Sequence, residues 1–409
     1  MPESNRLKKT LHQWGGANAT FFTYTHLSHD LCTGLLPALL PMIKIGLELS
    51  YLQSGLLLSA FTITSGLSQF PGGWLGDRFS RPLVITLGLI GVSLAALAVG
   101  LSSTYYLILV ILVIMGIFSG AYHPSATSLI SSYFGTDRRG KVIALHMVGG
   151  SVGFTLGPVL GGLIAKALGW HFAYIFLSIP TLLAALFVWL KFGRHPIVEI
   201  ETEIGKNPAG KSYSVPPKMG LLQVLRPIAV VTALSVATQL VAGTAIAFFP
   251  VYLVDRHQIA PAVAAMLMGV IRGGGIFGSL FGGWLSDHWG RRNAILITLA
   301  ATGPILYLST RLPFNPASVL VFVLFGSLLY MRQATTQPIL MDSVPAHLRS
   351  TIFGIYFGMS MEGTSLLQPV AGYFMDLYDI VTVFNVVALI SIGLSVIAFF
   401  TIKSLKLPH

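Results

Sequence analysis

The sequence has little charge. Only 10% of its 409 residues are Asp, Glu, Lys or Arg, whereas a soluble domain carries about 25%. Acidic residues are the scarcest, with 14 Asp and Glu against 25 Lys and Arg. The chain is instead 54% hydrophobic, and its mean hydropathy is +0.77. So few charges cannot cover a soluble surface of this size, which excludes a soluble multidomain protein and predicts a polytopic membrane protein.

Cysteine and enzyme motifs are also missing. Cys32 is the single cysteine and lies in an apolar run, which excludes a disulfide framework and a CxxC metal site. Nothing resembles a Walker loop, HExxH or GxSxG, so we predict neither an enzyme nor a cofactor. The formal charge of +11 does not indicate a nucleic-acid partner, because excess Lys and Arg on a membrane protein mark its cytoplasmic loops.

Long stretches without charge mark the membrane spans. Residues 83–136 contain no charged side chain, which is enough for two helices joined by a polar turn at residues 102–104. An apolar stretch of about 20 residues crosses a bilayer as one helix. We predict an all-α protein with helices over residues 16–41, 51–75, 82–101, 105–130, 141–165, 170–191, 223–250, 261–284, 293–310, 317–341, 350–375 and 380–402.

The basic residues orient these twelve spans. With a cytoplasmic N-terminus, nineteen Lys and Arg fall in cytoplasmic segments, and only Lys44, Lys166, Arg256 and Arg311 fall on the opposite side. Such an excess follows the positive-inside rule. We therefore predict a multi-pass protein of the inner cell membrane with both termini in the cytoplasm.

The two halves of the chain repeat. The sequence GWLGDRFSR at Gly73–Arg81 returns as GWLSDHWGR at Gly283–Arg291, and Arg139 and Arg349 keep the same offset of 210 residues. We predict two pseudo-symmetric six-helix bundles, 1–192 and 223–409, joined by a cytoplasmic linker, 193–222. In transporters built this way the substrate site lies between the repeats near the bilayer midplane.

The repeated loop sequences resemble the G-x-L-x-D-R-x-G-R-R signature of the major facilitator superfamily, with departures at Ser80, Pro82 and His288. The resemblance covers essentially the whole chain and implies a transporter that works by alternating access. A basic turn that only sets topology is the alternative. The gating residues implied by this signature are Asp77, Arg78, Arg81, Asp287 and Arg291.

Two further segments indicate a narrower group. Residues Gly149–Gly162 resemble the G-x-x-x-G-P-x-x-G-G motif of proton-coupled antiporters, which adds Gly157 and Pro158 to the gating candidates; a glycine-rich packing helix is the alternative. Thr25–Asp30 and Gly120–Pro124 resemble stretches of the fosmidomycin-resistance branch. That branch exports drugs in exchange for protons, so the resemblance implies proton-driven export.

Ionisable residues inside the spans are the candidate site. A charge at the centre of a span costs about 2.5–3.5 kcal/mol, so such groups face a cavity and usually serve a function. His26, His29 and Asp30 share one face of the first helix. We predict that Asp30 carries the proton, with His26, His29 and Glu362 as the other coupling candidates, since burial favours the neutral acid and a nearby cation favours the ionised one.

Other polar residues within the spans are candidates for substrate binding. They are His123, Arg272, Arg332, Tyr24, Tyr122, Gln239 and Gln337. A deep arginine such as Arg332 either pairs with Glu362 or Asp30 or binds an anionic group of the substrate. For His146, a solvated position at a helix end and a cavity position are equally compatible with the sequence.

The favoured hypothesis is a monomeric secondary transporter that exports a small anionic or amphiphilic molecule in exchange for protons. Its partners are that molecule, protons and the lipid bilayer. The first alternative is a transition-metal transporter that uses His26, His29, Asp30 and His123, although no metal ligands are assigned. The second alternative is a proton-coupled uptake symporter with the same fold.

Overall fold

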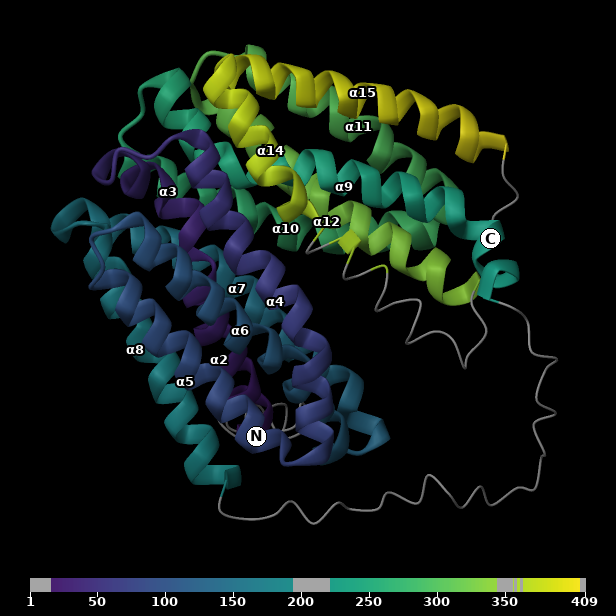
Figure 1. The fold of residues 1–409 in the computed structure, drawn as a ribbon. Helices are drawn as coiled ribbons and strands as arrows, with labels where there is room; N and C mark the ends of the chain where they lie inside the picture. Colours follow the sequence, from purple (N-terminus) through teal and green to yellow (C-terminus); the bar gives the residue numbers. More distant parts are fainter. Residues whose placement is uncertain (1–15, 194–220, 344–355, 357–358, 361–362, 405–409) are drawn as a thin grey trace, which may run out of the picture. The chain divides into compact units, whose positions relative to one another are not determined.

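The computed structural model describes residues 16–193, 221–343, 356, 359–360 and 363–404 (Figure 1). Throughout these ranges the backbone forms helices joined by short turns, and they contain no strand. The prediction of an all-α fold is confirmed. Nine of the helices in the described ranges are long and apolar enough to cross a membrane.

The helices follow the predicted spans in order. They are α2 (Gly16–Thr33), α3 (Leu35–Gly46), α4 (Tyr51–Arg78), α5 (Arg81–Gly100), α6 (Tyr105–Tyr133), α7 (Thr136–Leu168), α8 (Trp170–Val188), the short π-helix η1 (Trp189–Gly193), α9 (Leu221–His257), α10 (Pro261–Trp289), α11 (Arg291–Arg311), α12 (Pro316–Ser343), α14 (Thr364–Leu377) and α15 (Ile380–Ser404).

Two predicted spans differ in detail. The span 16–41 is divided into α2 and α3 at Gly34. Pro37 explains the break, because it has no amide hydrogen and its ring collides with the carbonyl of Thr33, four residues earlier. Of the predicted span 350–375, residues 350–355, 357–358 and 361–362 lie outside the described part of the chain, and α14 covers the remainder.

The first residues of corresponding helices in the two halves are separated by about the same 210 residues as the sequence repeat. Helix α4 begins at residue 51 and α10 at 261, while α5 begins at 81 and α11 at 291. Helices α6 and α12 begin at residues 105 and 316, one residue away from the same offset. Both copies of the repeated loop therefore join the end of one helix to an arginine that begins the next.

Packing divides the chain into two units. Unit 1 comprises Met1–Leu36 and Ala60–Ser214, and unit 2 comprises Pro37–Ser59 and Val215–His409. Within unit 2, the carboxylate of Asp376 accepts hydrogen bonds of 2.8 Å from the amides of Tyr51 and Leu52, the first residues of α4. The predicted division at 193–222 stays a prediction, since residues 194–220 are outside the described ranges.

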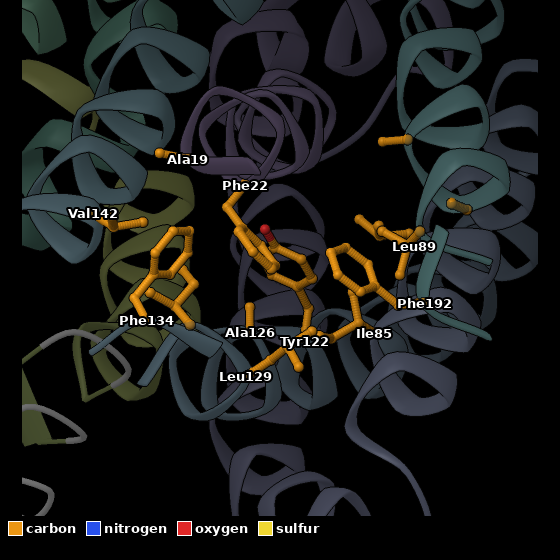
Figure 2. Packing of buried hydrophobic residues seen from close by; sticks show 14 residues of the cluster. Ala19, Phe22, Ile85, Leu89, Tyr122, Ala126, Leu129, Phe134, Val142 and Phe192 are labelled. Carbon is orange, nitrogen blue, oxygen red and sulfur yellow. The ribbon is translucent and has the colours of Figure 1, made fainter. Parts of the chain in front are cut away.

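The core of unit 1 surrounds the polar face of α2. Phe22 on α2 stacks on Phe192 with a centroid distance of 5.5 Å and packs edge-on against Phe134. Figure 2 shows these rings together with Tyr122, which is fully buried among them. This apolar packing fixes the rotation of α2, so that its polar residues face α6 and α7.

Candidate functional site

The polar face of α2 is buried inside unit 1. The exposed fraction is 4% for His26, 1% for His29 and 2% for Asp30. Asp30 lies between the two imidazoles: its Oδ1 is 2.7 Å from His29 Nδ1, and its Oδ2 is 3.2 Å from His26 Nε2. The structure thus brings together three of the predicted coupling residues. Glu362, the fourth, lies outside the described residues.

Hydrogen-bond partners determine where hydrogens must lie in this group. His26 Nδ1 is 2.8 Å from the carbonyl oxygen of His146, which can only accept, so this nitrogen carries a hydrogen. The opposite nitrogen, Nε2, faces the carboxylate of Asp30. Either Nε2 is protonated beside an ionised Asp30, or Asp30 is protonated beside a neutral His26. In both forms one proton is shared between His26 and Asp30.

His29 is held by a second set of contacts. Its Nδ1 donates to Asp30, and its Nε2 lies 3.1 Å from Ser119 Oγ on α6, which can donate to it. The ring of His29 stacks on Tyr122 at 4.5 Å, and the Tyr122 hydroxyl donates to Thr25 Oγ1 at 3.1 Å. This arrangement satisfies a neutral His29, so the shared proton of the group lies between His26 and Asp30.

His146 on α7 is part of the same group. It is 1% exposed, its Nδ1 donates to the carbonyl of Phe22 at 2.9 Å, and its ring stacks on His26 at 4.2 Å. His26 and His146 therefore donate reciprocally to backbone carbonyls across α2 and α7. The sequence did not distinguish this position from a solvated helix end, because the span boundary alone does not show which way the side chain points.

Glycines of α7 allow this close approach. A Cβ at Gly150 would lie 2.6 Å from His26 Nε2 and 2.7 Å from Asp30 Oδ2, closer than side chains pack. Cβ atoms at Gly153 and Gly157 would meet backbone carbonyl oxygens of α2 at 2.4 Å. The segment that resembles the antiporter motif is thus the surface on which α2 lies, with Pro158 inside the same helix.

His123 completes the cluster from α6. It is half-buried, and its ring lies edge-on to His26 at 5.2 Å and to His29 at 4.9 Å. Ligand-type atoms of His26, Asp30 and His123 all lie within 4.8 Å of one another. This proximity is compatible with the metal-transport hypothesis but does not test it.

Arg332 is the centre of a separate polar cluster in unit 2. Its side chain is fully buried. Nη1 donates to Ser235 Oγ at 2.7 Å, to the Ser235 carbonyl at 3.1 Å and to the Tyr356 hydroxyl at 3.4 Å, while Nη2 donates to Gln239 Oε1 at 2.7 Å. Ser235 also bonds Thr336, whose hydroxyl donates to the Arg332 carbonyl at 2.7 Å. Among the described residues, no carboxylate pairs with Arg332.

The remaining substrate candidates are half-buried. Tyr24 is half-buried and donates to the carbonyl of Pro180 at 3.1 Å, which joins α2 to α8. Arg272 on α10 and Gln337 on α12 are half-buried. Their predicted roles in binding stay predictions.

The gating candidates lie at the ends of helices. Arg78 is exposed and lies over the ring of Trp74 at 5.7 Å. Asp287 is exposed near the end of α10. Arg81 and Arg291 are half-buried and begin α5 and α11. The side chain of Asp77 lies outside the described part, so gating by these loops stays a prediction.

Comparisons with known proteins agree with this architecture. Residues 22–367 match the Major Facilitator Superfamily. The hexuronate transporter of Bacillus subtilis (strain 168) is 24% identical, with 82% of each chain covered. The fosmidomycin resistance protein of Escherichia coli (strain K12) is 21% identical, with 85% of each covered. Among solved structures, an inward-facing, occupied bacterial homologue of the lysosomal transporter Spinster is similar in fold, with 17% identity, a TM-score of 0.77 and coverage of 98% of this chain and 97% of that one.

Proposed function

Because this chain belongs to the Major Facilitator Superfamily, it is a multi-pass membrane transporter and not an enzyme, and we propose that it exports a small organic anion in exchange for protons by alternating access. The observation that carries the proposal is the buried Asp30 between His26 and His29. Exchange requires a group that binds a proton on one side and loses it on the other. The His26–Asp30 pair supports this role, with Asp30 as the carrier. The excess of basic residues in the loops supports a cytoplasmic position for both termini.

The surroundings of this pair support coupling over a purely structural role. His26 Nδ1 and Asp30 Oδ1 each have another partner, which leaves a single proton between His26 Nε2 and Asp30 Oδ2 that can reside on either group. The titratable side chains that face the pair are His29 on α2, Tyr122 and His123 on α6 and His146 on α7. Arrival of a proton or of substrate charge among them would change the preferred position of the shared proton.

The anionic cargo is supported by two independent features. Arg332 is a buried cation without a carboxylate partner in the described ranges. Relatives of similar length are a hexuronate transporter and a cis,cis-muconate transport protein, whose named cargoes are organic acids. A small organic acid is therefore the substrate class that we propose first.

Transport by purified protein in liposomes tests the proposal. Vesicles are loaded with labelled galacturonate, muconate or fosmidomycin, and the outside is made acidic. We expect efflux that depends on the pH gradient, and Asp30→Asn should abolish it while leaving substrate-for-substrate exchange. Asp379→Asn, the same change at an exposed carboxylate before α15, is the control that should retain gradient-driven efflux. Full gradient-driven transport by Asp30→Asn would refute the role of Asp30.

Symport is the second candidate, and charge favours it. The His26–Asp30 pair is neutral when it holds its proton, and Arg332 is neutralised by a bound monoanion, so the doubly loaded carrier is neutral at these two clusters. Closing the protein around a neutral site costs less free energy than closing it around a charged one, because the closed site is excluded from water. In the same vesicles, symport would appear as accumulation of external acid driven by the gradient, in place of efflux.

Metal transport is the third candidate, since ligand-type atoms of His26, Asp30 and His123 lie within 4.8 Å of one another. It predicts uptake of Mn²⁺ or Zn²⁺ that competes with protons. Metal flux without flux of any organic acid would favour this function over the one proposed.

A further inference from the structure

The polar clusters of the two units occupy equivalent positions in the 210-residue repeat. In unit 1, Tyr122 and three of the residues that it contacts form the Tyr122 cluster, and adding 210 to these four residue numbers gives Arg332 and its three side-chain hydrogen-bond partners. The matched pairs are Thr25 with Ser235, His29 with Gln239, Tyr122 with Arg332 and His146 with Tyr356. The sequence repeat thus places two versions of one site in the molecule.

The same pairs of positions are in contact in the two clusters, although the kind of contact differs. Tyr122 donates to Thr25 Oγ1 at 3.1 Å, and Arg332 donates to Ser235 Oγ at 2.7 Å. The ring of Tyr122 stacks on His29 at 4.5 Å, and at the matched positions Arg332 donates to Gln239.

The fourth position behaves in the same way. The rings of Tyr122 and His146 are 6.2 Å apart, and Arg332 lies 3.4 Å from the hydroxyl of Tyr356. Three partners of Arg332 therefore occupy the positions equivalent to three neighbours of Tyr122. His26 and His123 also contact Tyr122, and they correspond to Val236 and Gln333.

Charge separates the two clusters. Asp30 supplies an acid in unit 1, and the equivalent residue in unit 2 is Leu240. Arg332 is surrounded by the neutral acceptors Ser235, Gln239 and Tyr356. Neutral acceptors orient a guanidinium but do not cancel its charge, and no carboxylate of the described residues does so. A buried charge is costly unless it is paired.

The guanidinium also retains unused donors. Within the described part of the chain, the buried Nε of Arg332 has no hydrogen-bond partner. Nη2 has two hydrogens and a single acceptor, Gln239. A guanidinium with donors left on Nε and Nη2 suits the two oxygens of a carboxylate, phosphonate or sulfonate.

We propose that the Arg332 cluster is an oxyanion receptor, in which Arg332 binds the carboxylate, phosphonate or sulfonate group of the cargo and Ser235, Gln239 and Tyr356 hold the guanidinium in position. The proposal rests on the proposed transport of an organic anion and adds the group that is recognised and the unit that recognises it. Arg332 is fully buried in this structure. The anion therefore binds in a different conformation, in which the guanidinium is accessible.

Thermal unfolding of the full-length protein in lipid nanodiscs tests the receptor without a substrate or a pH gradient. The probes are acetate, methylphosphonate and sulfate, each compared with chloride at equal ionic strength. A site that binds them should raise the Tm by about 2 °C or more at saturating concentration. Arg332→Gln should remove this shift, because the guanidinium that donates to the oxyanion is gone.

Two variants keep the test decisive. Gln239→Glu places a carboxylate at the atom that now accepts from Nη2, so it should compete with a bound oxyanion for the guanidinium and weaken oxyanion binding by about tenfold or more. Arg311→Gln removes an exposed arginine of the same unit and should leave the shift unchanged.

Absence of an oxyanion-specific shift in the wild type, or its persistence in Gln239→Glu, would overturn the proposal. Since no gradient is used, failure here leaves proton coupling by Asp30 intact, and failure of coupling leaves the receptor intact.

Discussion

The two units hold polar clusters at equivalent positions, but the clusters differ in charge. In unit 1, Asp30 lies within 3.2 Å of two imidazoles, so acid and base compensate each other and share a proton. In unit 2, Arg332 is surrounded by neutral acceptors, and the position of the acid is taken by Leu240. The difference is the basis of the two proposed roles: the unit with an acid among its imidazoles is proposed to exchange a proton, and the unit whose arginine has no carboxylate partner among the described residues is proposed to bind an anion.

Packing differs between the units as well. Helix α9 runs without a break from Leu221 to His257, whereas the equivalent chain in unit 1 is divided into α2 and α3 at Gly34. Pro37 has Ala247 as its counterpart, so only unit 1 has the residue that interrupts the helical hydrogen bonds. The break comes one turn after Asp30.

The largest effect is expected from a methyl group placed against His26 and Asp30. Gly150→Ala would put a Cβ 2.6 Å from His26 Nε2, so His26 and Asp30 must separate, and overpacking of this kind costs about 1–3 kcal/mol. We expect gradient-driven transport to fall by about tenfold or more. Gly140→Ala on the same helix is the control, because no atom lies within 4 Å of its Cβ. Equal activity of the two variants would show that the His26–Asp30 contact is not required.

The next largest effect concerns the anchor of the arginine. Ser235→Ala removes an acceptor 2.7 Å from Arg332, and a hydrogen bond to a charged group contributes about 1.5–3 kcal/mol. Anion affinity should fall about tenfold or more, while the pH dependence of transport stays unchanged. Binding curves of the transported acid at several pH values measure both quantities. A shifted pH profile with unaltered affinity would contradict the assignment of the anion to unit 2.

The matched change in unit 1 should be milder. Thr25→Val removes the acceptor of the Tyr122 hydroxyl, and a bond between neutral groups contributes about 0.5–1.5 kcal/mol. The expected result is a small loss of stability without loss of anion affinity, measured by thermal unfolding and binding on the same sample. If Thr25→Val weakened anion binding as strongly as Ser235→Ala, the two clusters would not have separate roles.

The smallest effect is expected outside the spans. Hydrogen bonds from the hydroxyl and the amide of Thr382 lower the pKa of the Asp379 carboxyl, which caps the start of α15. Asp379→Ala should cost about 1 kcal/mol of stability. Because the folded pKa is lowered, this contribution is present at neutral pH and decreases as the pH falls below about 4. Unfolding of both proteins at several pH values checks this, and transport should keep its pH profile.

Much of this organisation could be predicted from the sequence. Charge-free stretches gave the helices, and the 210-residue repeat gave the matching of α4 with α10 and α5 with α11. The spacing of His26, His29 and Asp30 placed them on one face, since helical periodicity relates positions along one helix.

The contacts between helices could not be predicted in this way. The rotation of neighbouring helices brings His146 and Ser119 next to His26 and His29. In the same way it brings Tyr356 to the Arg332 cluster. That rotation is set by packing such as the approach of α2 to the glycines of α7. The repeat was the one signal that could have found Tyr356, as the counterpart of His146.

Proton release on anion binding tests most directly the claim that unit 1 holds the proton and unit 2 the anion. The transported acid is added at constant pH to purified protein in weakly buffered solution, and a pH-indicator dye reports the protons. Exchange predicts release of about one proton per bound anion from the wild type, none from Asp30→Asn despite binding, and neither binding nor release from Arg332→Gln. Anion binding that leaves the proton count unchanged in the wild type, or equal release from Asp30→Asn, would contradict the account.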